Sequence, residues 1–501
     1  MPAEEETKSS PFRGRSAVRS GFLTGLSYLV LSGSGALAGV YLAHKFGRNE
    51  LTDGFLAAYG VYLVLVLGAQ AFRMVVVPDL TRAEAEGRLA VEFGAYAVAF
   101  LALAVPVSVV VAVFPGFFGE LITGRLPHSS AMIAGRALVW LVPSAFAQLL
   151  ASLAASALAA RDSYAAPAAG FALGGISGLV FFVLAADAHG LISLAWGLAL
   201  NGAVALALPL AVLLRLGGRP RHLLGARTLG FRHRLWRLGL GAAVPLAVQG
   251  LYVIALRFAA GTGEGNVTSL SYAYLLAAMF VSATAFSLSL IAAAPLTRRG
   301  VNAETAAEHV VHSAWVSLAI VGAASGIVAL VGGRVFTAAL GHHYSGNVGD
   351  DLGRLVVYLA PWMVASAVFS ITYPLLFVMR RTRLLLPLAA AAVVVDVPIS
   401  IAGRAWGGLT GVAVALGIST ILLVAGLMAA LAPRTLALSA VGLGQLALIV
   451  GAATALAFGG ASLLLGAVPA AVLGLLVYGL LLVVMRQFGL ADAWHYVRAL
   501  H

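Results

Sequence analysis

The chain contains no cysteine among its 501 residues. This absence excludes disulfides, thiolate metal sites and cysteine nucleophiles, and it leaves the redox compartment undetermined. Lysine occurs only at Lys8 and Lys45, which together with abundant alanine, glycine and leucine indicates a bacterial source with a GC-rich genome. Charged residues make up 10% of the chain, whereas a soluble domain carries roughly a quarter of its residues as charges. The 61% of hydrophobic residues is far more than a soluble core requires.

Catalytic signatures and long polar segments are also missing. No gap between apolar stretches is much longer than about twenty residues, which argues against an enzyme with an external catalytic domain. Neither a P-loop nor a dinucleotide-binding fingerprint occurs, so ATP hydrolysis and a nucleotide cofactor are not expected. His342-His343 followed by Asp350-Asp351 superficially resembles a metal cluster, but metal ligands on a helix favour i, i+4 spacing. The sequence predicts no cofactor, no metal and no enzymatic activity.

What the sequence does contain is fourteen long apolar stretches separated by short polar gaps. A helix needs about 20 apolar residues to cross the hydrocarbon of a bilayer, whereas strands of a membrane barrel alternate with period two. The continuous apolar runs therefore predict an all-α integral membrane protein with about 14 transmembrane helices. The predicted spans are 21–43, 54–77, 91–114, 131–159, 166–186, 191–214, 238–258, 267–294, 309–331, 354–378, 384–403, 408–431, 438–459 and 465–486.

Arginine is distributed unevenly between the gaps. The two tails and the even-numbered gaps hold 22 of the 31 lysines and arginines, the odd-numbered gaps hold 8, and Arg73 lies within a span. The positive-inside rule then places both termini in the cytoplasm of a bacterial plasma membrane protein. Residues 1–20 form a polar tail without a cleavable signal peptide, and residues 215–237 form a basic cytoplasmic linker. The net charge of +12 is explained by this topology and by anionic membrane lipids, without nucleic acid as a partner.

The chain also contains a weak internal repeat. Each predicted half contains six spans. Because this number is even, the two halves insert into the membrane with the same orientation, as parallel repeats do in transporters. The repeat predicts an N-lobe at 21–214, a C-lobe at 238–432 and two extra helices within 433–501. Its matches are Leu80-Thr81-Arg82 with Leu296-Thr297-Arg298 at an offset of 216 residues, and Leu141-x-Pro143 with Leu359-x-Pro361 and Gly190-Leu191 with Gly408-Leu409 at an offset of 218.

Several motifs resemble one family of transporters. The segment from Phe46-Gly47-Arg48-Asn49-Glu50-Leu51-Thr52-Asp53-Gly54-Phe55 to Tyr59 resembles the FGxxxxTDAF signature of MviN/MurJ-type lipid II flippases. The resemblance runs from about residue 20 to 490 and implies two six-helix lobes around a central cavity, with an extra helix pair forming a lipid groove. These flippases belong to the multidrug/oligosaccharidyl-lipid/polysaccharide exporter superfamily. The further matching motifs are Val77-Pro78, Ala195-Trp196-Gly197, Gly265-x-Val267-Thr268-Ser269-Leu270-Ser271-Tyr272-Ala273 and Ala294-Pro295-Leu296.

The chain departs from the family at its cavity arginines. The positions where these flippases carry arginine correspond to Ser32, Ala38, Val66 and the pair Tyr274-Leu275. A pyrophosphate group in a low-dielectric cavity needs cationic partners, for which the arginine fork is well suited. The resemblance therefore implies the scaffold, whereas it leaves lipid II open as the cargo.

Charged residues in or beside the spans are the first candidates for binding or gating, because ionisable groups at membrane depth are costly. Arg73, with Gln70 one turn before it, is a candidate phosphate ligand or snorkels to the cytoplasmic interface. Asp53 either caps the start of the second helix or takes part in gating or ion coupling. Arg257 either contacts a headgroup from outside or anchors the end of its helix.

Three further candidates lie inside spans. Gln249 and Asn201 offer hydrogen bonds to sugar hydroxyls or, alternatively, bonds between helices. Asp396 is the only carboxylate deep inside a span. It is a candidate for coupling to a proton or a monovalent cation, and the alternative is pairing with a neighbouring helix or with Arg404.

These observations predict a flippase that moves a polyprenyl-linked saccharide by alternating access between two lobes. Lipid-linked saccharide, membrane lipids and a coupling cation or proton are the expected partners. Two alternatives remain open. One is a cation-coupled multidrug exporter of the same superfamily, and the other is a non-transporting membrane scaffold that recruits proteins of envelope synthesis.

Overall fold

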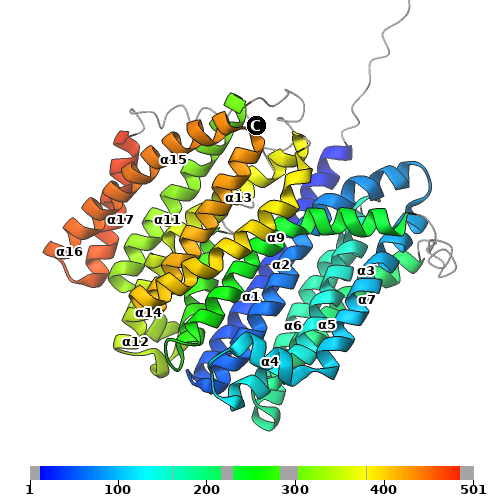
Figure 1. The fold of residues 1–501 in the computed structure, drawn as a ribbon, viewed down its shortest axis with the longest axis horizontal. Coiled ribbons are helices and arrows are strands. Elements are labelled where there is room, and N and C mark those ends of the chain that lie inside the picture. The colour runs from blue at the N-terminus through cyan, green and yellow to red at the C-terminus, as the bar shows by residue number, and fades with distance from the viewer. Residues whose placement is uncertain (1–11, 162, 216–229, 282–302, 380, 486–501) are drawn as a thin grey trace, which may run out of the picture. The chain divides into compact units, whose positions relative to one another are not determined.

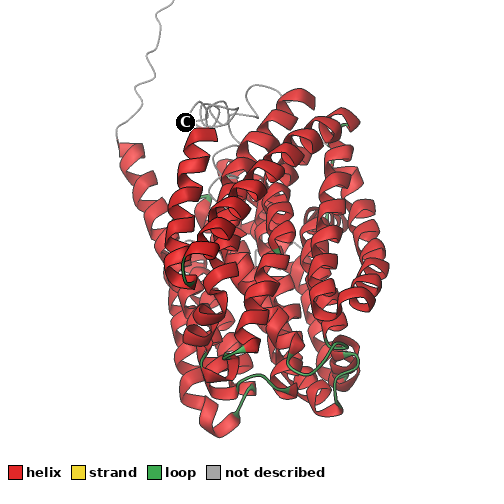
Figure 2. Cartoon of the chain, turned by 90° about the vertical axis from the view of Figure 1, so that its left-hand side faces the viewer, coloured by secondary structure: helices red, strands yellow, loops and turns green. Residues whose placement is uncertain are grey.

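The computed structural model describes residues 12–161, 163–215, 230–281, 303–379 and 381–485. Within these ranges every regular element is a helix and no strand is present (Figure 2). Nine helices of the described residues are long and apolar enough to cross a membrane, or ten if one bent pair is a single span. The predicted all-α, multi-pass membrane fold is confirmed. The Leu296-Thr297-Arg298 and Ala294-Pro295-Leu296 motifs and most of the basic linker lie outside the described residues.

Thirteen of the fourteen predicted spans coincide with helical segments over their described parts, whereas the predicted span 354–378 covers the end of one helix and a second helix bent by 41° from it. Two predicted spans share one long helix, which is interrupted by non-helical backbone at Gly407 and Gly408. The helices are α1 (Phe12–Phe46), α2 (Glu50–Ala85), α3 (Leu89–Val113), α4 (Pro115–Thr123), α5 (His128–Ala159), α6 (Ala165–His189), α7 (Ile192–Arg215), α9 (Phe231–Ala259), the helix Asn266–Val281, α11 (Ala303–Leu340), α12 (Asn347–Tyr358), α13 (Ala360–Val378), α14 (Leu385–Leu431), α15 (Pro433–Thr454), α16 (Gly460–Leu464) and α17 (Ala467–Met485). Short helices occur at His342–Tyr344 and Thr382–Leu384, and the π-helical segment Ala455–Gly459 joins α15 to α16.

The chain divides into two compact units that do not follow chain order. Unit 1 contains Met1–Tyr41, Leu65–Pro115 and Arg136–Gly239, and unit 2 contains Leu42–Val64, Gly116–Gly135 and Leu240–His501. Two short segments of the predicted N-lobe therefore belong to the unit that contains the second half of the chain. The predicted lobe boundaries stay a prediction.

In unit 1, α6 and α7 form a tightly packed hairpin. Gly178 and Gly197 face each other, and a Cβ atom on either would lie 2.5 Å from the carbonyl oxygen of the other. The two backbones can approach this closely only because both residues lack a side chain, as in many membrane helix pairs. The hairpin turns at Gly190, whose φ of 63° is accessible to glycine at no steric cost.

The two halves of α14 form a similar hairpin in unit 2. Gly403 and Gly411 leave no space for a Cβ atom between the two backbones. The turn is made at Gly408, which has a φ of 55° and, like Gly190, a strongly negative ψ. The same backbone device therefore appears at the two glycines of the predicted repeat.

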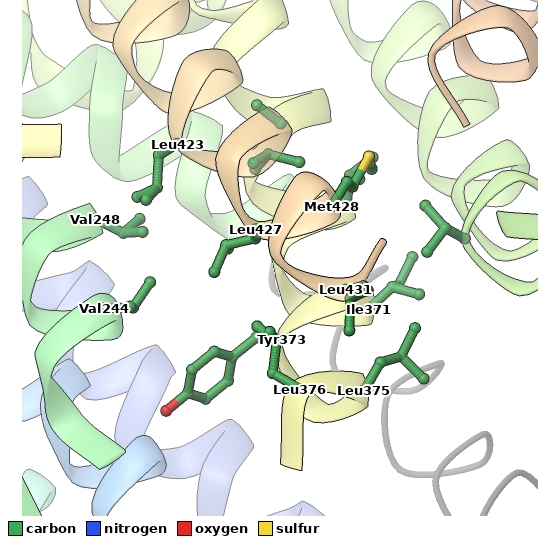
Figure 3. Close-up of a cluster of buried hydrophobic side chains, with 14 of the residues drawn as sticks. Val244, Val248, Ile371, Tyr373, Leu375, Leu376, Leu423, Leu427, Met428 and Leu431 are labelled. Carbon is green, nitrogen blue, oxygen red and sulfur yellow. The ribbon is translucent and has the colours of Figure 1, made fainter. Parts of the chain in front are cut away.

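An apolar core holds α9, α13 and α14 together in unit 2. Val244 and Val248 of α9, Ile371 and Leu376 of α13 and Leu427 of α14 are all buried in it (Figure 3). On each helix, aliphatic side chains spaced three to four residues apart lie on one face, and these faces pack against one another.

The C-terminal helices α15 and α17 pack against α11 (Figure 1). The ring of Phe458, in the π-helical segment, fills a notch formed by Gly326 of α11 and Gly474 of α17. The hydroxyl of Tyr478 donates a hydrogen bond of 2.8 Å to the carbonyl oxygen of Ala319. The Phe458 ring and the Tyr478 hydrogen bond therefore hold α17 against α11 within unit 2.

Candidate functional site

The segment between α1 and α2 begins the candidate site. Gly47, with a φ of 67°, ends α1, and Asn49 precedes the first turn of α2. The side-chain oxygen of Asn49 accepts hydrogen bonds from the backbone N–H and the hydroxyl of Thr52, at 3.0 and 3.2 Å. Asn49 is therefore the residue that caps α2. The sequence-based assignment of Asp53 as the cap of its own helix is wrong, because the cap position was already occupied.

Asp53 instead caps a different helix. Its carboxylate accepts hydrogen bonds from the backbone N–H groups of Gly265 at 2.6 Å and Thr268 at 2.8 Å, and from the hydroxyl of Thr268 at 2.6 Å. These donors are the otherwise unsatisfied N–H groups at the start of the helix Asn266–Val281, where a negative charge is also favoured by the helix dipole. Asp53 is completely buried, and Gly265 lies 212 residues further along the chain.

Arg48 holds the same turn from the other side. Its Nε donates to the carbonyl oxygen of Gly265 and to the hydroxyl of Ser269, both at 2.9 Å, and its Nη2 donates to Oδ1 of Asn266 at 2.7 Å. Gly265 has a φ of 74°, and a Cβ atom there would overlap the Arg48 side chain. We call the six hydrogen bonds that join Arg48 and Asp53 to residues 265–269 the polar lock.

Burial and the polar partners of Asp53 act on its charge in opposite directions, and burial has the larger effect. Asp53 lies in the first turn of α2, one residue before the predicted span. Burial raises the pKa of Asp53 above its usual value of 3.8, while the hydrogen bonds from Thr268 and Gly265 and the charge of Arg48 oppose this rise. The carboxylate is stable in this place only because every one of its described partners is a donor or a cation.

The polar lock continues into the beginning of α5. The hydroxyl of Ser129 donates to Oε1 of Glu50 at 2.9 Å, and the hydroxyl of Ser130 donates to the backbone oxygen of Glu50 at 2.8 Å. Gly54 lies directly against the backbone of Ser130, without space for a side chain. The start of α2 is therefore held by two elements of unit 2 that are distant in sequence.

An aromatic stack follows the polar lock along the helix Asn266–Val281. The rings of Tyr252 and Tyr274 lie parallel at 3.7 Å, and the ring of Trp362 lies 4.5 Å from that of Tyr274. The hydroxyl of Tyr274 donates to Oε1 of Gln249 at 2.8 Å. Gln249 thus makes the bond between helices that was one of its two predicted roles, while the indole N–H of Trp362 has no partner in the described residues.

Asp396 lies completely buried in the first half of α14. The hydroxyl of Ser400 donates to its Oδ1 at 3.4 Å, whereas its Oδ2 and the hydroxyl of Ser419 have no hydrogen-bond partner among the described residues. The predicted alternative of an ion pair with Arg404 is wrong, since none forms in the described part of the chain. Eight residues of helix place the two Cα atoms about 12 Å apart along the helix axis, and the Arg404 guanidinium instead lies against Gly261.

The remaining predicted residues do not join these groups. Asn201 lies in the α6–α7 hairpin of unit 1, where its Oδ1 faces Gly174 without a hydrogen-bond partner in the described structure. Arg257 lies exposed at the end of α9, with its guanidinium over Gly124. Gln70 and Arg73 belong to α2, but their side chains lie outside the described residues.

Sequence reasoning missed the pairing within the polar lock. Arg48, Gly265 and Thr268 stood in the two motifs that carried the family resemblance, but nothing in either motif indicates that the two segments touch. Among the described residues, no group of three or more histidine, cysteine, aspartate or glutamate side chains has the geometry of a metal site. His342 and His343 are exposed, and their rings lie 4.0 Å apart.

Comparison with known proteins identifies the fold. No family model matches the chain, and no curated protein matches it in sequence. Among solved structures, the lipid II flippase MurJ in an inward closed conformation matches with a TM-score of 0.73 at 14% identity, over 93% of this chain and 99% of that one. An inward-facing multidrug resistance MATE family transporter of the MOP superfamily matches with a TM-score of 0.59 at 15% identity, over 82% and 96%. The outward-facing conformation of such a transporter matches with a TM-score of 0.58 at 15% identity, over 85% and 96%. The fold implied by the sequence motifs is therefore confirmed.

Proposed function

We propose that the chain is a transporter that moves a polyprenyl-linked saccharide across the bacterial plasma membrane, with both termini in the cytoplasm. The observation that carries this proposal is the match to a lipid II flippase over nearly the whole of both chains. The two motifs that contain Asp53 and Thr268 support it, because hydrogen bonds join them to each other in this structure. The cargo is a lipid-linked saccharide. Its identity stays open, because the spans lack the cavity arginines of the lipid II flippases.

The polar lock is the proposed closure on the external side. A transporter that works by alternating access must seal one end of its path while the other is open. The lock joins segments 212 or more residues apart through six hydrogen bonds, and none of these bonds lies within a single helix. Opening this end requires all of them to break, which water can compensate on the external side.

Asp396 is the proposed coupling group. A buried carboxylate with one oxygen unpartnered is costly at membrane depth unless it carries a proton or binds a cation. The neighbouring hydroxyls of Ser400 and Ser419 would complete such a site with oxygen ligands. Binding and release there would bias the balance between the two open states.

The test is transport by the purified protein in liposomes. A lipid-linked saccharide on one leaflet should reach the other at a rate that depends on a proton or sodium gradient. Asp396→Asn should remove the gradient dependence, because the amide cannot exchange a proton or balance a cation, while Asp351→Asn, on the exposed first turns of α12, should keep it. Proteoliposomes that never move the lipid-linked saccharide would contradict the proposal.

The second candidate is a cation-coupled exporter of small organic cations. The similarity to multidrug resistance MATE transporters in both inward-facing and outward-facing conformations favours it. The same liposomes distinguish the two functions, because an exporter would release a fluorescent cation such as ethidium against its gradient and leave the lipid in place.

A further inference from the structure

The first turns of α9 belong to a different unit from the rest of that helix. Unit 1 ends at Gly239 and unit 2 continues from Leu240, so the segment 231–239 belongs to unit 1 although it begins the second half of the chain. With 29 residues, α9 is about 44 Å long, whereas the hydrocarbon of a bilayer is about 30 Å thick. Under the predicted orientation, the first turns of α9 therefore extend beyond the hydrocarbon on the cytoplasmic side.

One face of this segment is fixed to unit 1 by an ion pair. Nε and Nη2 of Arg234 donate to Oε1 and Oε2 of Glu92 at 3.0 and 2.6 Å, and the guanidinium lies 5.7 Å from the centre of the Tyr96 ring. The Tyr96 hydroxyl donates in turn to Asp79. Both charged side chains are only 15% exposed, so this bidentate pair is stronger than an ordinary surface pair. Since Leu238, one turn later, is also buried, the rotation of the segment about its axis is fixed.

The opposite face of the segment carries Arg232 and Trp236. Two residues correspond to about 200° of helix rotation, so these side chains point away from those of Arg234 and Leu238. Both are exposed, Trp236 to 57%, and their spacing of four residues makes them neighbours on the helix surface. Arg232 forms no ion pair with any described residue, in contrast to Arg234. We call Arg232 and Trp236 the outer face of α9.

The chemistry of the outer face matches the headgroup region of an anionic bilayer. Tryptophan is enriched at membrane–water interfaces, and arginine is attracted to the negative surface of the cytoplasmic leaflet. Residues 215–237, which lead into and include the outer face, contain seven arginines and no acidic residue. A tryptophan alone would suit any lipid, whereas the unpaired Arg232 favours a lipid with a net negative charge.

We propose that the outer face of α9 binds an anionic phospholipid of the cytoplasmic leaflet. Arg232 donates to the headgroup phosphate, and the Trp236 ring lies against the glycerol and the upper acyl chains. The ion pair between Arg234 and Glu92 holds the outer face toward the bilayer. The partner is a lipid of the bilayer and not the cargo, so this inference goes beyond the proposed function and does not depend on it.

Gly239 permits a reporter beside the outer face. It is exposed, it follows Trp236 by three residues, and a Cβ atom there would meet nothing within 4 Å. Because the chain has no cysteine, Gly239→Cys provides a single attachment point for a bimane fluorophore. The full-length labelled protein is placed in nanodiscs of phosphatidylcholine in which phosphatidylglycerol replaces a rising fraction of the lipid, and the bimane emission is recorded.

Arg232→Gln is the test variant, since it removes a charge without removing any ion pair of the described structure. Arg88→Gln is the matched control. Arg88 is also an exposed arginine of unit 1 on the predicted cytoplasmic side, and it pairs with Glu86. Both variants lower the cytoplasmic charge by the same amount, so a difference between them reports on the outer face and not on the charge of the whole protein.

We expect the emission to change with the phosphatidylglycerol fraction and to saturate. Arg232→Gln should raise the fraction at half-saturation about fivefold, and Arg88→Gln should leave it unchanged. Equal emission of the Arg232→Gln protein and its parent in pure phosphatidylcholine would show that the segment still docks on unit 1. Emission that does not respond to phosphatidylglycerol would overturn the proposal. Equal half-saturation of the two variants would also overturn it, because the response would then reflect diffuse charge.

Discussion

The residue that organises the candidate site is Asp53, which satisfies the N-terminus of a helix formed more than 200 residues later. A buried carboxylate that meets three donors is stable, but the donors depend on it to the same degree. Removing the acceptor leaves two backbone N–H groups and a hydroxyl buried without partners.

We therefore predict that Asp53→Ala lowers the free energy of unfolding by about 1–3 kcal/mol or more, since each unsatisfied buried donor costs about that much. Asp53→Asn should lose less, because its amide oxygen can still accept from Thr268 while its NH₂ group faces the N–H of Gly265. The measurement is unfolding in mixtures of SDS and mild detergent. Asp351→Asn is the control, because an exposed ion pair such as Asp351–Arg354 contributes little.

At this scale the sequence indicated the important residue and missed its partner. Asp53 stood out because it belongs to a recognisable signature. Its predicted role as a local cap failed because capping residues are judged from neighbours in the chain, and Asn49 makes the local bonds. The contact with Thr268 depends on how helices pack, and no local pattern contains that information.

At the scale of elements, the predicted repeat has a counterpart in the backbone. Gly190 and Gly408 both turn a helical hairpin with positive φ, at 63° and 55°. The proline match is less regular, because Pro143 lies inside α5 whereas Pro361 lies at the start of α13, after a bend of 41° from α12. The glycine turns were predictable, because few residues other than glycine adopt a positive φ. The bend was not predictable, because the same apolar run is compatible with one straight helix and with two helices joined at an angle.

The docking of α17 allows a matched test of packing within one helix. A Cβ atom on Gly474 would lie 2.6 Å from the ring of Phe458, whereas one on Gly479 would meet nothing within 4 Å. Both changes to alanine gain the same helix propensity, so the difference between them isolates the packing at the notch. We predict that Gly474→Ala is less stable than Gly479→Ala by about 1–3 kcal/mol in the same unfolding assay. Equal stabilities would show that the phenylalanine ring does not hold α17 in place.

At the scale of the whole molecule, the helical fold class and the approximate limits of most helices were predictable, because crossing a bilayer imposes a length and a composition on each segment separately. The division into compact units was not predictable in the same way. Residues 42–64 and 116–135 belong with the second half of the chain through packing, although their sequence position places them in the first.

The absence of cysteine permits a direct test of whether the polar lock must open during function. In the double variant Arg48→Cys/Ser269→Cys, the two thiols replace side chains that are hydrogen-bonded at 2.9 Å, so a short, reducible bis-thiosulfonate should bridge them. If the external side opens in each cycle, the bridge should reduce lipid transport at least about tenfold, and reduction should restore the rate of the unbridged variant. The control variant Asp351→Cys/Arg354→Cys, bridged within α12, should transport at an unchanged rate. Transport that continues through a complete bridge would place the moving closure elsewhere in the chain.

A bridged and an unbridged protein that both move no lipid and no cation, yet retain envelope-synthesis proteins, would favour the scaffold over either transporter, because a scaffold has no step in which these six hydrogen bonds must break.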